Sequence, residues 1–300
     1  MSELIDDRPS TDAGIRTAAA NGIEIAYETF GDPTDPTILL VMGLGTQMLA
    51  WPDPLCETLA GAGHHVVRFD NRDVGLSTHI DADPPSMLQM ALGRHTPYQL
   101  GDMAADAFGL LDALDIERAH VVGASMGGFI SQTMALSQPD RVASLTLIMT
   151  STGSKRVGRP KAKVAKRLAT LEAPATKAEA VDLAVETFRL IGSPEHFDED
   201  VVRRKAERSY DRSHDPDGRL RQLAAIMAQP DRTARLRELQ VPTLVVHGLH
   251  DPLVQPSGGL ALAEAIPGAT FLGFHGMGHD LPETLWPTIA ARILELTARA

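Results

Sequence analysis

The chain has 300 residues, of which 43% are hydrophobic, and carries a formal net charge of −11. With a mean hydropathy near zero, this composition is typical of a water-soluble globular protein with one ample core. The negative charge repels a phosphate backbone, so we expect no nucleic-acid partner. No apolar run approaches the roughly 20 residues that a membrane-spanning helix requires, so we expect no integral membrane segment.

Eight segments rich in β-branched and apolar residues predict strands. The first two are joined at Asn21-Gly22, a dipeptide that favours a tight hairpin turn. Most of the others are short, continuous apolar runs, which are typical of strands buried on both faces of a largely parallel sheet. The predicted strands are 15–19, 23–30, 37–42, 65–69, 120–122, 142–149, 241–248 and 270–274.

Apolar residues at helical spacing fill most intervals between the later strands. The predicted helices are 51–62, 98–116, 128–136, 259–266 and 285–296, and the last of them closes the chain. Because strands and helices alternate, we predict an α/β fold with a doubly wound, mostly parallel sheet of about eight strands. The long connection 81–98 either lines a pocket or forms a short surface helix. Its apolar residues are Met87, Leu88, Met90 and Leu92.

The charge pattern changes between Ser154 and Pro230. Sixteen basic residues stand there against twelve acidic ones, whereas the remainder of the chain has a net charge of −15. Helical segments without a convincing strand continue to about residue 238. We therefore predict a helical cap, 154–238, inserted between the two parts of one core, 1–153 and 239–300. An independent helical domain is the alternative.

The N-terminal residues and the single cysteine both indicate the cytoplasm. Residues 1–12 are polar and acidic, without the basic start and apolar middle of a secretory signal. The lone Cys56 excludes an internal disulfide and agrees with a reducing compartment. It lies on an expected helix, where we predict a small buried side chain.

A Gly-x-Ser-x-Gly pattern lies between an apolar strand and a helix. The pentapeptide is Gly123-Ala124-Ser125-Met126-Gly127. A strand, a sharp turn and a helix of this kind form a nucleophile elbow, in which the serine is strained and a Cβ on either flanking glycine would clash. The sequence therefore predicts that Ser125 is an exposed nucleophile.

A serine hydroxyl needs a base, almost always a histidine, which an acid holds in the right tautomer. His279 lies in a glycine-containing loop just after the last strand, at the same C-terminal sheet edge as Ser125. Asp251 follows the preceding strand, so adjacent strand ends bring acid and base together in the chain order Ser, Asp, His. His275 is the rival base and Asp280 the rival acid.

Acyl transfer also needs N–H donors for the oxyanion of the tetrahedral intermediate. We expect one donor from the backbone of Met126, at the start of the elbow helix. The other is expected from Leu44, because its flanking glycines let the backbone approach closely.

The loop 70–77 follows another predicted strand at the sheet edge where ligands of open α/β folds bind. It is either part of a ligand site or a loop whose shape is fixed by ion pairs. The second interpretation is simpler, and it assigns the ion pairs to Asp70, Arg72 and Asp73.

Two groups of side chains have metal-ligand spacing. They are His247 with His250 and Asp251, and His275 with His279. Neither group lies on a predicted helix, and the proposed triad already accounts for one histidine and one aspartate. We therefore expect no metal and no cofactor.

Together these motifs resemble the α/β-hydrolase superfamily, over nearly the whole chain except the N-terminal tail and the cap. More narrowly, four segments besides the elbow resemble actinobacterial esterases, a group that includes aclacinomycin methylesterase and mycobacterial lipase/esterase-like hydrolases. They are 40–43, 51–53, 72–78 and 276–279. Many superfamily members have histidine at the position of Met42 and glycine at that of Asp73, so a ligand contact by either residue is not implied.

From the residues and this resemblance we expect a serine carboxylesterase that hydrolyses a small to medium acyl ester or a methyl ester through an acyl-enzyme. A carbon–carbon bond hydrolase, a thioesterase or a cofactor-free perhydrolase shares the serine elbow and stays open as an alternative. A non-catalytic ligand-binding protein of the same fold is the further alternative. The expected partner is a small-molecule ester, and a homodimer stays open.

Overall fold

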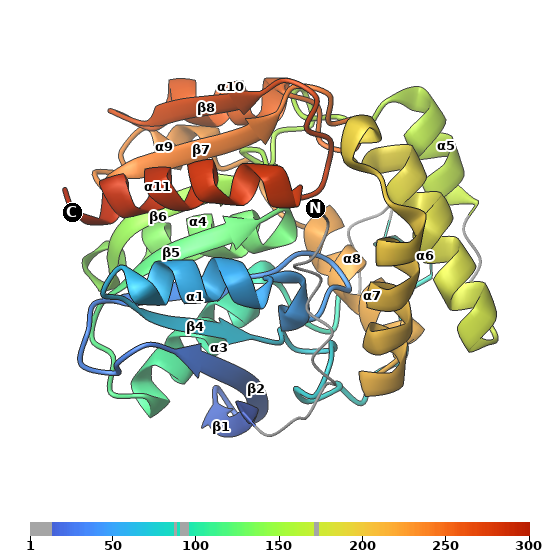
Figure 1. Ribbon diagram of the computed structural model, residues 1–300, viewed down its shortest axis with the longest axis horizontal. Coiled ribbons are helices and arrows are strands. Elements are labelled where there is room, and N and C mark those ends of the chain that lie inside the picture. The colour runs from blue at the N-terminus through green and yellow to red at the C-terminus, as the bar shows by residue number, and fades with distance from the viewer. Residues whose placement is uncertain (1–13, 87–88, 91–95, 171–173) are drawn as a thin grey trace, which may run out of the picture.

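The computed structural model describes residues 14–86, 89–90, 96–170 and 174–300 (Figure 1). The predicted connection 81–98 therefore lies partly outside the described residues, including Met87, Leu88 and Leu92. Met90 is described and is buried. No helix within the described ranges is both long and apolar enough to cross a bilayer.

One eight-stranded sheet runs through the molecule, in the order β1-β2-β4-β3-β5-β6-β7-β8. The strands β1 and β2 form an antiparallel hairpin, β2 also pairs antiparallel with β4, and all later neighbours are parallel. The strands are β1 (Arg16–Ala20), β2 (Ile23–Phe30), β3 (Thr37–Val41), β4 (His65–Phe69), β5 (Ala119–Ala124), β6 (Val142–Ile148), β7 (Thr243–Gly248) and β8 (Thr270–Phe274). The predicted doubly wound α/β fold class is confirmed.

The apolar runs follow from burial on both faces of the sheet. In β3, Leu39 and Val41 pack into one core cluster, while Ile38 and Leu40 pack into the other. Successive side chains of a strand point to opposite faces, so a strand covered by helices on both sides must be apolar throughout.

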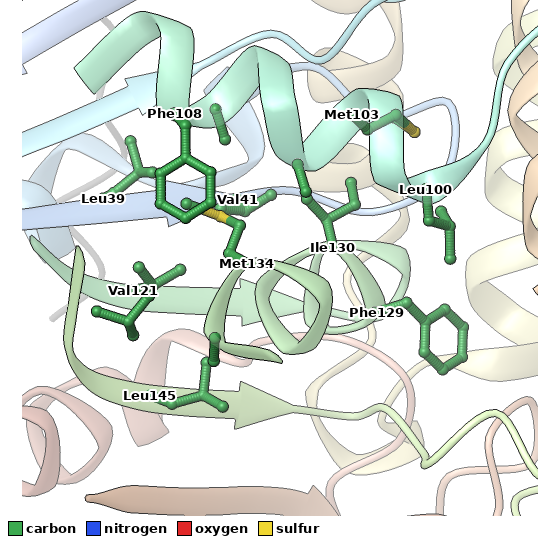
Figure 2. Close-up of a cluster of buried hydrophobic side chains, with 14 of the residues drawn as sticks. Leu39, Val41, Leu100, Met103, Phe108, Val121, Phe129, Ile130, Met134 and Leu145 are labelled. Carbon is green, nitrogen blue, oxygen red and sulfur yellow. The ribbon is translucent and has the colours of Figure 1, made fainter. Parts of the chain in front are cut away.

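Helices cover both faces of the sheet. The helices α1 (Asp53–Gly61) and α11 (Trp286–Thr297) lie in front of it in Figure 1. The helices α3 (Leu100–Ala113), α4 (Met126–Ser137) and α10 (Ser257–Ala265) cover the opposite face. Figure 2 shows the second layer, where Phe108 of α3 and Met134 of α4 pack over Leu39, Val121 and neighbouring strand residues. Short 3₁₀ turns occupy Met48–Ala50, Pro139–Arg141, Pro194–His196 and Glu283–Leu285.

Between β6 and β7, the described residues form helices and no strand. These helices are α5 (Ala162–Ala169), α6 (Lys177–Ile191), α7 (Glu199–Arg212), α8 (Pro216–Met227) and α9 (Thr233–Leu236). The helices α5 to α8 gather at one side of the sheet, at the right of Figure 1. We call residues 154–238 the cap segment. Its boundaries as a domain stay a prediction.

Candidate active site

The backbone of the elbow has the strained form that the glycines predict. Ser125 stands between β5 and α4 with φ 55° and ψ −116°, a region that side chains other than glycine rarely enter. A Cβ on Gly127 would lie 2.0 Å from the carbonyl oxygen of Val41, and one on Gly123 would lie 2.3 Å from the hydroxyl oxygen of Ser131. Only glycine fits at either position, because α4 crosses directly against the neighbouring strand.

Hydrogen bonds on both sides hold this turn in place. The Ser125 N–H donates to the carbonyl of Ile148 at 2.9 Å, at the end of the adjacent strand β6. The Ser125 carbonyl accepts from the Thr150 hydroxyl at 2.8 Å and from the Gly128 N–H at 3.0 Å. The surrounding structure thus fixes a conformation that the chain would otherwise avoid.

The structure brings the three predicted triad residues together in one chain of contacts. The Ser125 Oγ lies 3.0 Å from Nε2 of His279, and Nδ1 of His279 lies 2.7 Å from Oδ2 of Asp251. The other carboxylate oxygen of Asp251 accepts the N–H groups of Leu253 and Val254, at 2.8 and 2.9 Å. Since a carboxylate requires a donor, Nδ1 of His279 carries the proton and Nε2 presents its lone pair to the serine.

A second histidine adjoins the same carboxylate without competing for it. Nε2 of His247 lies 3.8 Å from Asp251 and donates to the carbonyl of Val254 at 2.7 Å. This histidine is completely buried, and burial lowers its pKa. It is therefore neutral at neutral pH, and its other ring nitrogen, Nδ1, has no partner among the described residues.

The two rival residues have other positions. His275 is exposed and stacks edge-on with the ring of His250, with the ring centroids 4.5 Å apart. Asp280 directs its carboxylate to the N–H and hydroxyl of Ser193 in the cap segment. Neither residue has a recorded contact with the Ser125 hydroxyl, within the residues that the structure covers.

Two backbone amides stand beside Ser125 without acceptors. A Cβ on Gly43 would lie 3.2 Å from Cβ and 3.6 Å from Oγ of Ser125, which places the start of the Gly43–Gly45 loop against the serine. Leu44 is the next residue, and Met126 begins α4. No acceptor in the described part of the chain is recorded for either N–H. Both amides are therefore available to a ligand.

Two aspartates and one arginine of the 70–77 loop form buried ion pairs, and two of their three partners lie in the cap segment. Arg72 pairs with Asp106 of α3 at 2.6 Å. Asp70 pairs with Arg212 at 2.7 Å, and both oxygens of Asp73 bond to Arg221 at 2.9 Å. Burial raises the pKa of Asp70, which the charge of Arg212 opposes. The ion pairs thus fasten the cap segment to the core as well as fixing the loop.

Several polar contacts that join the cap segment to the site have no recognisable signal in the sequence. Gln222 of α8 accepts the N–H of Gly45 at 2.7 Å and donates to the carbonyl of Arg72 at 2.7 Å. Gln47 donates to the carbonyls of Ser209 and Ser213, and accepts from Arg212. A glutamine on a charged helix has no local pattern that marks such a role.

One group of potential metal ligands occurs in the described residues, at Asp73, His79 and Asp215. Both carboxylates already bond to the guanidinium of Arg221, and His79 lies 2.6 Å from Asp215. The arginine supplies the positive charge that a metal would bring. Of the predicted alternatives, His247 bonds to a backbone carbonyl and His250 stacks on His275.

A mostly parallel sheet with a strained serine turn between strand and helix defines the class of α/β hydrolases. The chain belongs to the alpha/beta hydrolase fold family, whose model matches residues 36–284. It is an enzyme of that family.

Individual relatives support this assignment over nearly the full length. The chain is 32% identical to a rhodomycin D methylesterase of Streptomyces sp. (strain C5), covering 95% of this chain and 98% of that protein. It is 27% identical to a 2-hydroxy-6-oxononadienedioate/2-hydroxy-6-oxononatrienedioate hydrolase of Pseudomonas putida, covering 86% of this chain and 85% of that one. Among solved structures, the enol-lactonase of Burkholderia xenovorans LB400 superposes with a TM-score of 0.75 at 25% identity, covering 94% of this chain and all of that one.

Proposed function

We propose that this protein is a serine carboxylesterase in which Ser125 attacks the ester carbonyl. The observation that carries the proposal is the continuous contact from Asp251 through His279 to Ser125, at 2.7 and 3.0 Å. Both distances lie within hydrogen-bond reach, which is what proton transfer from the serine requires.

In the first half of the reaction, His279 takes the proton of Ser125 as the serine oxygen bonds to the carbonyl carbon. Asp251 holds the imidazole in the required tautomer and stabilises the imidazolium that forms. The free amides of Leu44 and Met126 receive the oxyanion, and losing one such donor typically costs about 3 to 4 kcal/mol of transition-state stabilisation. His279 then protonates the departing alcohol, which leaves an acyl-enzyme.

In the second half, a water molecule attacks the acyl-enzyme while His279 acts again as base and then as acid. The product acid leaves and the serine regains its proton. None of these steps requires a metal or an organic cofactor.

The substrate we propose is a carboxylic ester with a small to medium acyl group, or a methyl ester. Support comes from the rhodomycin D methylesterase, to which 95% of this chain is similar at 32% identity. The cap segment contacts both the Gly43–Gly45 loop and the His279 loop, so it lies beside the proposed catalytic residues.

The test is hydrolysis of p-nitrophenyl acetate and butyrate by the wild type and by Ser125→Ala. We expect the variant to lose on the order of 10⁴-fold or more in kcat, because members of a triad act as a unit. The matched control is Ser137→Ala at the other end of α4, whose hydroxyl donates to the carbonyl of Met134 at 3.1 Å and lies outside the proposed triad. Undiminished activity in Ser125→Ala would overturn the proposal.

A second candidate is carbon–carbon bond hydrolysis, favoured by the Pseudomonas putida relative. The substrate in that relative's name contains no ester, so its hydrolysis must break a carbon–carbon bond. Supplying this chain with a 2-hydroxy-6-oxo-dienoate and with a matched methyl ester separates the two functions. We expect a kcat/KM at least 100-fold higher for the ester, and the reverse ratio would favour the second candidate.

A further inference from the structure

The loop that carries His279 is bonded directly to the cap segment. Where α6 ends, the chain passes through Ile191, Gly192 and Ser193. The carbonyl of Ile191 accepts the backbone N–H of His279 at 2.8 Å, and the Ser193 hydroxyl oxygen accepts the N–H of Gly278 at 2.8 Å. Two successive amides of the base's loop thus have their acceptors in the cap segment.

The carboxylate of Asp280 completes this contact from the opposite side. Its Oδ2 accepts the backbone N–H of Ser193 at 3.1 Å, and its Oδ1 accepts the Ser193 hydroxyl proton. The Ser193 hydroxyl therefore accepts from one residue of the loop and donates to another, so that all its bonds here go to residues flanking His279. Ser193 is completely buried, so water does not replace these bonds.

The two backbones also meet at contact distance. A Cβ on Gly278 would lie 2.3 Å from the carbonyl oxygen of Gly192, and a Cβ on Gly192 would lie 3.2 Å from Oδ2 of Asp280. Because both residues are glycines, the two segments can approach until their main chains touch. A small displacement of the α6 terminus must therefore move the His279 loop with it.

We propose that Ser193 and Asp280 form a clasp through which the cap segment positions His279 for catalysis. The two are positioning residues: they hold the loop on both sides of the base, while Asp251 orients its ring. The inference rests on the proposed function, since it treats His279 as the base for Ser125. It also gives Asp280 a role other than that of triad acid.

The clasp acts on the distance between Nε2 of His279 and the Ser125 hydroxyl, which is 3.0 Å with the clasp formed. A shift of about 1 Å in a reacting group can cost on the order of 100-fold in rate. Since neither clasp residue is proposed to bind the ester, losing the clasp changes kcat and leaves KM nearly unaltered.

The experiment measures hydrolysis of p-nitrophenyl acetate by the wild type, Ser193→Ala, Asp280→Ala and the double variant. We expect each single variant to lose about 10- to 100-fold in kcat with KM within about threefold of the wild type. The kcat of the double variant should be no lower than that of the more impaired single variant, since both changes open the same clasp. Asp280→Asn keeps an acceptor for the Ser193 hydroxyl, so its kcat should lie between the values of the wild type and of Asp280→Ala.

The matched control is Asp182→Asn, which breaks an exposed ion pair from α6 to Arg203 in α7 and has no recorded contact with the His279 loop. It should keep wild-type kcat. A thermal unfolding curve is measured for each variant, and kcat is assayed at a temperature well below every unfolding midpoint. If the alanine variants do not fold, Asp280→Asn replaces them as the test of the clasp.

A second readout, the rate of Ser125 labelling by a fluorophosphonate, separates failure of this inference from failure of the proposed function. No Ser125-dependent labelling in the wild type would overturn the esterase proposal itself. With wild-type labelling present, lowered stability at unchanged kcat and labelling rate would overturn the clasp as a positioning device. A raised KM at unchanged kcat would overturn it too, because the segment would then act on substrate binding.

Discussion

Gly127 shows how a single missing side chain permits the strained serine turn. A Cβ at this position would stand 2.0 Å from the carbonyl oxygen of Val41 and 2.8 Å from that of Met42. Both obstacles are backbone atoms of β3 and the residue after it, and α4 cannot withdraw without pulling Ser125 away from His279. The glycine is thus required by packing and not by local flexibility.

We therefore expect Gly127→Ala to destabilise the fold by several kcal/mol, with loss of soluble expression or a large fall in the urea midpoint. The control is Gly101→Ala near the start of α3, where a Cβ would meet nothing within 4 Å. That change should leave stability unaltered or raise it by about 0.5 to 1 kcal/mol, since alanine is the better helix former. Equal behaviour of the two variants would contradict the packing argument.

At this scale the sequence predicted Ser125, Asp251 and His279 as a triad because each has a local marker. Flanking glycines mark the serine, and the ends of two apolar strands mark the proposed acid and base. Ser193 and Gln222 have no such marker, since their partners lie 85 and 177 residues away and are chosen only by the tertiary fold. The ion-pair partners of Asp70 and Asp73 were also not predictable, because they too lie far away in the sequence, although both aspartates were expected to form ion pairs.

Among the helices of the cap segment, α8 bonds directly to the proposed oxyanion loop. Its residue Gln222 is completely buried and bridges the N–H of Gly45 and the carbonyl of Arg72. The amide side chain satisfies a donor and an acceptor of two core loops at once. The position of Leu44, one residue before Gly45, depends on this bridge.

Gln222→Leu should therefore leave both backbone groups unpaired, at a cost of about 2 to 3 kcal/mol in the free energy of unfolding. We also expect a fall of about tenfold in kcat for p-nitrophenyl acetate. Gln255→Leu is the matched control, because that glutamine makes one exposed bond to the carbonyl of Arg159. If Gln222→Leu lowered the stability but kept the kcat of the wild type, the bridge would have only a structural role.

Element boundaries were predicted to within a few residues, for reasons that lie in the ends of helices. The predicted helix 98–116 begins at Leu100, where the Asp102 carboxylate accepts the N–H of Gln99 at 2.7 Å. The predicted helix 128–136 begins two residues earlier, at Met126, because the turn at Ser125 leads directly into it. Apolar spacing marks the middle of a helix, whereas its first turn depends on such local bonds.

For the whole molecule, several buried histidines link stability to pH. Burial lowers the pKa of His120 to about 4, with smaller effects from the charges of His64 and Arg118. Burial also lowers the pKa of His64, His65 and His247. In the unfolded chain these imidazoles titrate near 6.5. Between about pH 6.5 and pH 4, His120 therefore binds more protons in the unfolded chain than in the folded one.

It follows that the contribution of His120 is complete above about pH 6.5 and is lost as the pH falls through about 4. Its full size is on the order of 3 kcal/mol. Urea unfolding at pH 7, 6, 5 and 4.5 should show a shallower loss of stability for His120→Asn than for the wild type. Ser144→Ala removes the 2.9 Å contact to His120 but keeps the imidazole, and it should retain most of the wild-type slope. If stability fell with pH as steeply in His120→Asn as in the wild type, His120 would not be the source of this pH dependence.

The proposed triad also has a consequence for how the protein acquires activity during its synthesis. The serine turn is built from consecutive residues, whereas Ser125 and His279 lie 154 residues apart and Asp251 precedes His279 by 28. A nascent chain whose first six strands have left the ribosome carries Ser125 without the proposed acid and base. The proposed triad is complete only when the last two strands dock, so we expect an unfinished chain to have no esterase activity.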